Sequence, residues 1–114
     1  MMIETPLRLG RGGNAREFHY ERSRRVRKER HAVGFLLRQF QRPATPCGFV
    51  ITRIAPGNGL DPHDNLPMAC KSACDAIAEW MGVDDKRADV ISYRFRQERG
   101  PWGLRIESTE WREP

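Results

Sequence analysis

The stretch from Phe49 to Ile54 limits what this chain can fold into more than any other. It reads FVITRI, which is apolar on both alternating faces and rich in β-branched side chains. A strand of this kind is covered on both sides and lies inside a sheet, not at its edge. The remainder of the chain must therefore supply neighbouring strands and a layer that covers them.

Two further regions show the alternation typical of half-buried strands. The first runs from Ile3 to Leu9 and contains Pro6, which favours an edge position. The second runs from Ile91 to Thr109 and is divided by a turn at Gly100 to Gly103, so it predicts a β-hairpin. Three arginines of this hairpin share one face: Arg94, Arg96 and Arg105. That face is either a second basic patch or the solvated side of the sheet.

Two helices are predicted from apolar residues at helical spacing. The first runs from Arg16 to Gln41, with its stripe at Val26, Val33, Leu36, Leu37 and Phe40. The second runs from Leu66 to Met81, with its stripe at Leu66, Ala69, Ala73, Ile77 and Trp80. At 114 residues the chain is one domain, residues 1–114. We expect an α+β fold in which two helices pack on a mixed or antiparallel sheet.

The net charge of +5 is unevenly distributed. The segment from Arg8 to Arg42 holds eleven basic residues and three glutamates, a net charge of +8, which leaves −3 for the remainder. Like charges at helical spacing repel each other, so this density favours contact with phosphates over an ordinary solvated face. The residues expected to contact DNA here are Arg16, Arg22, Arg24, Arg25, Arg27 and Lys28. The turn from Gly10 to Asn14 either approaches a phosphate or simply connects two elements.

The three cysteines, Cys47, Cys70 and Cys74, indicate free thiols in a reducing cytoplasm. No apolar run is long enough to span a bilayer. Cys70 and Cys74, with His63 nearby, superficially suggest zinc, but three ligands in this arrangement would be unusual. We therefore expect buried free thiols in a cytoplasmic protein that has no membrane partner.

An acidic stretch from Leu60 to Asp85 stands out in this basic chain. Asp61 and Asp64 precede the second helix, Lys71 projects from its polar side, and an acid pair ends the stretch. Mg²⁺ prefers hard oxygen ligands, neutralises a phosphate and lowers the pKa of a bound water. We therefore expect Asp61, Asp64 and Asp85, or Asp84 in place of the last, to hold a metal ion. Lys71 would then neutralise charge on the phosphate in the transition state.

Each of these acids also has a purely structural interpretation. Asp64 and Asn65 are residue types that cap helices. The Asp84–Asp85 pair suits a polar turn after Gly82. Lys71 and Asp75, four residues apart, suit an ordinary exposed ion pair.

The order Asp64-Asn65-Leu66, Lys71, Asp75-Ala76-Ile77 and Gly82-Val83-Asp84-Asp85 resembles the RusA family of Holliday-junction resolvases, which are phage-type endodeoxyribonucleases. Asn14 is similar to the N-terminal asparagine of that family, and the resemblance runs from about Leu7 to Arg96. It implies that Asp64 and Asp85 are catalytic metal-binding aspartates and that Lys71 is the catalytic lysine. Pro62 stands in the usual place of the first aspartate, so Asp61 would serve from one position further back.

The resemblance also implies a Mg²⁺-dependent homodimer, with Mn²⁺ able to substitute, that cuts four-way DNA junctions in bacteria or phage-infected cells. A junction has two strands to cut, and two active sites related by a two-fold axis suit that task. One rival is a non-catalytic DNA-binding accessory protein with a degenerate acidic site. Another is an interaction protein whose basic helix binds an acidic partner.

Overall fold

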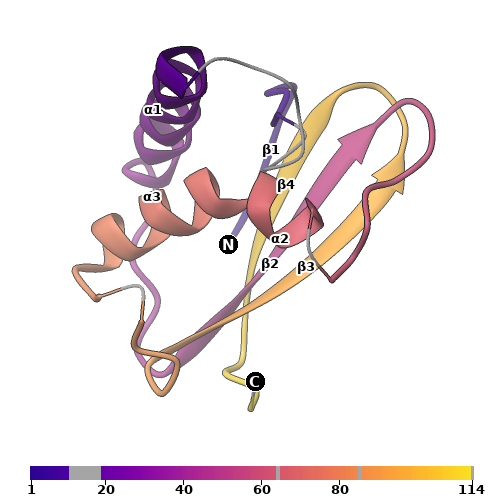
Figure 1. Ribbon diagram of the computed structural model, residues 1–114. Helices are drawn as coiled ribbons and strands as arrows, with labels where there is room; N and C mark the ends of the chain where they lie inside the picture. The colour runs from indigo at the N-terminus through magenta and orange to yellow at the C-terminus, as the bar shows by residue number, and fades with distance from the viewer. Residues whose placement is uncertain (11–18, 64, 85, 114) are drawn as a thin grey trace.

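Strand β2 (Cys47–Ala55) lies in the interior of a four-stranded mixed sheet, as its apolar sequence predicts, and all nine of its residues are buried. The computed structural model describes residues 1–10, 19–63, 65–84 and 86–113. The strand order is β1-β4-β2-β3 (Figure 1). The other strands are β1 (Met2–Thr5), β3 (Ile91–Arg99) and β4 (Gly103–Thr109). Strand β1 lies at an edge and ends before Pro6, which confirms its expected position.

The expected β-hairpin is wrong, because β2 separates β3 from β4. Strand β2 pairs in parallel with β3 and antiparallel with β4. Two strand spacings amount to about 10 Å, which the three residues between β3 and β4 can span. The backbone N–H of Gly100 donates to the Ala55 carbonyl where this connection passes the end of β2. Two strands show the same alternation of apolar and polar residues whether they pair with each other or both pair with a strand between them. The sequence pattern therefore did not distinguish these two arrangements.

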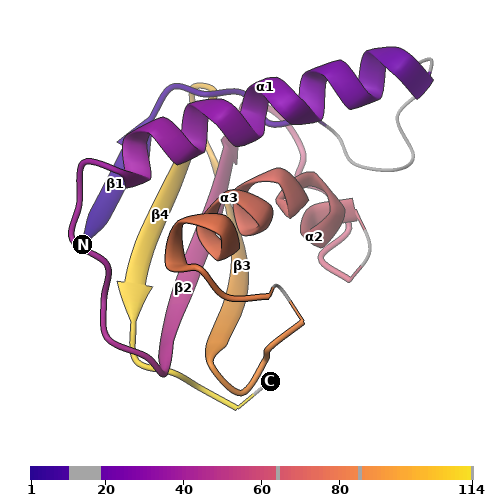
Figure 2. The ribbon, with the colours of Figure 1, turned by 90° about the vertical axis from the view of Figure 1, so that its left-hand side faces the viewer.

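All helices lie on one face of the sheet, as the two ribbon views show (Figures 1 and 2). The first, α1 (His19–Leu37), ends before the predicted end at Gln41, and residues 16–18 of the predicted segment lie outside the described residues. The predicted second helix is wrong as a single element, because it is divided into α2 (Asn65–Ala69) and α3 (Lys71–Met81). Cys70 separates them with φ −91° and ψ 0°, outside the helical region. Its N–H is shared between the carbonyls of Leu66 and Pro67, a pattern common at helix ends.

The core lies between the helices and the covered face of the sheet. It consists of Ile3, Phe49, Ile51, Leu104 and Ile106 from the strands, and of Val33, Leu37, Ala73 and Ile77 from the helices. Trp80 packs edge-on against Phe49 with ring centroids 6.3 Å apart. Phe40, which was expected on the buried stripe, lies beyond the end of α1 and is 39% exposed. No helix in the described part of the chain combines the length and the apolar character needed to cross a membrane.

The opposite face of the sheet is charged and is covered by no helix of the described residues. Its register places Arg96 and Arg105 on either side of Thr52, so the expected sharing of a face is confirmed. Arg105 forms ion pairs with Glu98 at 2.7 Å and with Glu4 at 3.3 Å. These hydrogen bonds raise the pKa of Arg105 and lower that of Glu98. Because Glu4 and Glu98 pair with Arg105 on this face, its charge is mixed, which favours a solvated side over a basic patch.

Candidate functional site

A groove of about 560 Å³ lies along the exposed side of α3 and contains the predicted lysine. We call it the Lys71 groove, and its lining residues are Arg30, Lys71, Asp75, Ala78, Glu79, Val83 and Asp84. Lys71 begins α3, whereas Asp84 follows the end of that helix. The structure therefore brings together side chains from both flanks of α3.

A tight turn at Gly82 produces this juxtaposition. Gly82 has φ 69° and ψ 30°, a left-handed conformation that glycine adopts without steric cost. Its N–H donates to the Glu79 carbonyl, and the N–H of Val83 donates to the Ala78 carbonyl, which is the Schellman arrangement. The chain leaving α3 consequently runs back beside that helix (Figure 2), and the expected end of the helix at Gly82 is confirmed.

Lys71 is both paired and accessible. Its Nζ lies 3.0 Å from Oδ1 of Asp75, so the ion pair expected from the four-residue spacing is present. The Lys71 side chain is 63% exposed, and an ion pair this solvated contributes at most about 1 kcal/mol to stability. An anion entering the groove would therefore compete with Asp75 for Lys71 at little cost.

Two described aspartates of the acidic stretch, Asp61 and Asp84, accept hydrogen bonds within local turns. Oδ1 of Asp61 accepts from the N–H of His63 at 3.2 Å, and the Asp61 carbonyl accepts from the N–H of Leu66 at 2.9 Å. Oδ1 of Asp84 accepts from the N–H of Lys86 at 2.9 Å. Asp61 is thereby tied to the first turn of α2, and Asp84 to the loop that follows α3.

The predicted metal site cannot be assembled from the residues that the structure describes. Asp64 and Asp85, two of its three proposed ligands, lie outside them. Within the described ranges, no three His, Cys, Asp or Glu side chains are grouped closely enough to hold a metal ion. The side chains that line the Lys71 groove include the carboxylates of Asp75, Glu79 and Asp84. Carboxylate oxygen is the ligand type that Mg²⁺ prefers. Asn65 also has a buried Oδ1 that meets no donor among the described residues.

The cysteines behave as the sequence predicts. All three are free thiols; Cys47 and Cys70 are buried and Cys74 is half-buried. Burial raises the pKa of Cys70 to about 12, while the nearby Arg53 acts to lower it and Glu29 to raise it.

Some basic side chains of α1 are exposed to solvent, whereas others are half-buried or form ion pairs within the protein. Arg24, Arg27 and Lys28 are exposed. Arg22 is half-buried, and Nη1 of Arg25 lies 2.7 Å from Oε2 of Glu29. Asn14 and Arg16, also expected to contact DNA, lie outside the described residues. Of the predicted basic set, the three exposed residues are therefore the best placed to meet a phosphate.

Glu29 is a functional candidate that sequence reasoning missed. Its side chain is buried, and it accepts hydrogen bonds from the Gly10 N–H, from Arg25 and from the Ser72 hydroxyl. These contacts fix α1 to the start of α3, beside Lys71. A sequence signal did exist, because Glu29 falls on the apolar stripe three residues after Val26.

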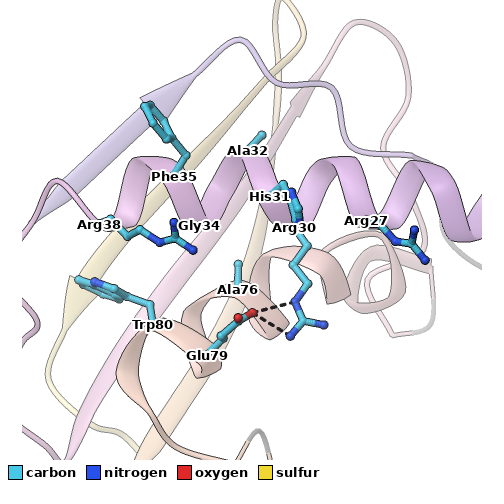
Figure 3. Close-up of a pocket in the computed structure, with 10 residues that line it drawn as sticks. All are labelled: Arg27, Arg30, His31, Ala32, Gly34, Phe35, Arg38, Ala76, Glu79 and Trp80. Carbon is cyan, nitrogen blue, oxygen red and sulfur yellow. Dashed lines mark hydrogen bonds and ion pairs between the residues drawn. The ribbon is translucent and has the colours of Figure 1, made fainter.

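A second groove, of about 1010 Å³, lies between α1 and α3 (Figure 3). We call it the basic groove, and it is lined by Arg27, Arg30, His31, Ala32, Gly34, Phe35, Arg38, Ala76, Glu79 and Trp80. Across it, Nε and Nη2 of Arg30 bind Oε2 of Glu79 at 3.1 and 2.8 Å. Arg30 and Glu79 also line the Lys71 groove, so the two grooves meet at this ion pair.

The fold and site define a small α+β protein whose mixed sheet is covered by helices on one face and whose covered side carries two polar grooves. No protein-family model, no curated protein and no solved structure matches the chain. The residues themselves, and the resemblance of their order to that of the RusA family, are therefore the basis for a function.

Proposed function

We propose that this protein is a Mg²⁺-dependent, structure-selective DNA endonuclease that cuts four-way junctions as a homodimer. The observation that carries the proposal is the placement of Lys71 and Asp84 in the walls of one groove beside a basic helix. The order of residues that resembles the RusA family passes through this groove. Both lines of reasoning point to hydrolysis of a phosphodiester.

In this proposal Asp61, Asp64 and Asp85 hold Mg²⁺, for which Mn²⁺ can substitute. A bound ion of this kind neutralises the scissile phosphate and lowers the pKa of a water molecule. Lys71 exchanges Asp75 for a phosphate oxygen and stabilises the negative charge that develops there. The Ser72–Glu29 hydrogen bond holds the adjacent turn of α3 in place, which positions Lys71.

The basic helix supplies the affinity for DNA. The exposed residues Arg24, Arg27 and Lys28 contact the phosphate backbone, which gives binding that weakens steeply as salt is added. Arg25 acts differently, because its guanidinium is bound to the buried Glu29 and stabilises the helix contact. Two copies of the chain would present two sites to the two strands that must be cut.

The proposal is tested with a synthetic four-way junction and Mg²⁺. Asp64→Asn and Asp85→Asn are each expected to abolish cutting while junction binding persists. The matched control is Asp89→Asn, since Asp89 is an exposed acid of the same loop that pairs with Arg87 at 2.9 Å. That control is expected to cut at the rate of the unaltered protein.

Two results would contradict the proposal in different ways. If the unaltered protein binds junctions but never cuts them with Mg²⁺ or Mn²⁺, the protein is a DNA-binding accessory protein. If it binds neither junctions nor duplexes at low salt, the basic helix serves an acidic protein partner instead.

A further inference from the structure

The basic groove combines positive charge with accessible guanidinium groups. Its walls hold three arginines, Arg27, Arg30 and Arg38, against one carboxylate, Glu79. Arg27 and Arg38 are exposed, and neither side chain makes a hydrogen bond or ion pair within the described ranges of the chain. At the far end, Nη1 of Arg42 approaches the Trp80 carbonyl at 3.5 Å. The groove therefore suits an anion.

The groove-lining residues of α1 form a straight stripe along one side of the helix. Apart from Ala32, they follow the spacing of three and four residues that places side chains on one face: Arg27, Arg30, His31, Gly34, Phe35 and Arg38. At 1.5 Å per residue, the stripe from Arg27 to Arg38 is about 16 Å long. A DNA strand carries one negative charge per nucleotide, so a stripe of this length can meet several phosphates of one strand.

We propose that the basic groove binds the phosphate backbone of one DNA arm and leads that strand to the Lys71 groove. Arg27 and Arg38 contact phosphates at its two ends. Arg30, between them, exchanges Glu79 for a phosphate as the strand enters. This assignment rests on the proposed function for the role of the Lys71 groove, but DNA binding in the basic groove is measured separately from cutting.

The Arg30–Glu79 ion pair has the properties that such an exchange requires. Its side chains are 45% and 62% exposed, so water already screens the pair and its separation is easy. It also stands where the two grooves meet. Figure 3 shows Arg30 reaching across from α1 to Glu79 on α3, with Arg38 on α1 and Trp80 on α3 at the other end of the groove. Glu79 thus opposes DNA entry in the free protein.

Two observations favour DNA over an acidic peptide as the occupant. The three arginines are held along one rigid helix, which suits a stiff polyanion such as DNA, whereas an acidic peptide is flexible and has no fixed charge spacing. The groove also has aromatic side chains at its rim: Phe35 is 66% exposed, and Trp80 is half-buried. Such rings stack on the bases of an unpaired strand, as arises at a branch point.

The test measures binding of a fluorescent four-way junction in EDTA, where Mg²⁺-dependent cutting is absent. The variant Arg27→Gln/Arg38→Gln is expected to bind at least roughly tenfold more weakly and to lower the slope of log affinity against log salt by about 2. The control is Arg94→Gln/Arg96→Gln, which removes the same charge from the open face of the sheet and is expected to bind like the unaltered protein. Glu79→Gln is expected to tighten binding severalfold. All variants should unfold at the same temperature.

Each outcome decides the assignment. Equal weakening by the two double variants would overturn it, because net charge alone would then explain binding. So would a Glu79→Gln protein that binds more weakly, or polyglutamate that binds as tightly as DNA and loses affinity in the same variant. If the unaltered protein binds through Arg27 and Arg38 but never cuts, the endonuclease proposal fails and the DNA groove stands. If the unaltered protein cuts junctions but its binding does not depend on Arg27 and Arg38, the endonuclease proposal stands and the assignment of the DNA groove fails.

Discussion

The Ser72 hydroxyl on α3 donates a 2.8 Å hydrogen bond to Oε1 of Glu29 on α1, and the two residues are only 2% and 3% exposed. The other carboxylate oxygen of Glu29 accepts from Arg25 and from the Gly10 N–H. A buried carboxylate is stable only when its oxygens are satisfied in this way. The contact therefore fixes the basic helix relative to the turn of α3 that begins with Lys71.

Glu29→Gln is expected to destabilise the fold by about 1.5–3 kcal/mol, because hydrogen bonds to a charged acceptor are lost inside the protein. The amide group keeps the volume but presents N–H groups to donors that need an acceptor. Urea unfolding measures the effect, with Glu21→Gln as the control on the exposed side of α1. The control should change stability by less than about 0.5 kcal/mol. Equal stability of the two variants would show that the Glu29 contacts contribute little.

The buried thiol of Cys70 is expected to make the protein less stable in alkaline solution. Burial raises the pKa of its thiol from 9.0 to about 12 in the folded protein. Above about pH 9 the thiol ionises in the unfolded chain but stays protonated in the folded protein. The contribution of Cys70 to the free energy of unfolding is therefore complete below that pH. It is lost between that pH and pH 12, by up to about 1.4 kcal/mol per pH unit. Urea unfolding at several alkaline pH values should show a steeper decline for the unaltered protein than for Cys70→Ala. Parallel profiles would contradict the assignment.

The sequence predicted the elements better than their connections. The run from Phe49 to Ile54 identified the interior strand because burial on both faces leaves a direct composition signal. The pairing of β3 and β4 left no such signal, since both strands alternate in the same way whether they pair with each other or with β2. The interruption at Cys70 was also hidden, because the apolar spacing continues through it.

The site shows the same division. Lys71 and Gly82 were identified from residue type and spacing, and the turn at Gly82 accounts for the approach of Asp84 to Lys71. The basic groove was missed because it is formed jointly by α1 and α3. The sequence of neither helix indicates how the two helices pack against each other. Glu29 was missed because it entered the sequence reasoning only as one of three glutamates in the charge of its segment, whereas its partners come from distant parts of the chain.

Two glycines provide a test of the packing. A Cβ on Gly48 would lie 2.6 Å from the Glu110 carbonyl oxygen and 2.7 Å from Oγ of Ser92, so Gly48→Ala should cost about 1–3 kcal/mol. A Cβ on Gly34, inside α1, would meet no atom within 4 Å among the described residues beyond its own chain neighbours and helix backbone, so Gly34→Ala should stabilise the protein by about 0.5–1 kcal/mol. Thermal unfolding of both variants measures the difference. A tolerated Gly48→Ala would mean that β2 and the end of β4 are not this close.

Lys71 provides the most direct test of chemistry in the groove. Lys71→Gln should lower the rate of junction cutting by about 10²–10³-fold, because the charge that stabilises the transition state is lost. Its junction affinity in EDTA should fall by less than about tenfold, since one phosphate contact among several is removed. Asp75→Asn, which keeps the lysine and removes the charge of its half-buried partner, should change the rate by less than about tenfold. Single-turnover cutting with Mg²⁺ separates these effects. A Lys71→Gln protein that cuts at the unaltered rate, or whose cutting declines only in proportion to its affinity, would leave Lys71 as a surface lysine paired with Asp75.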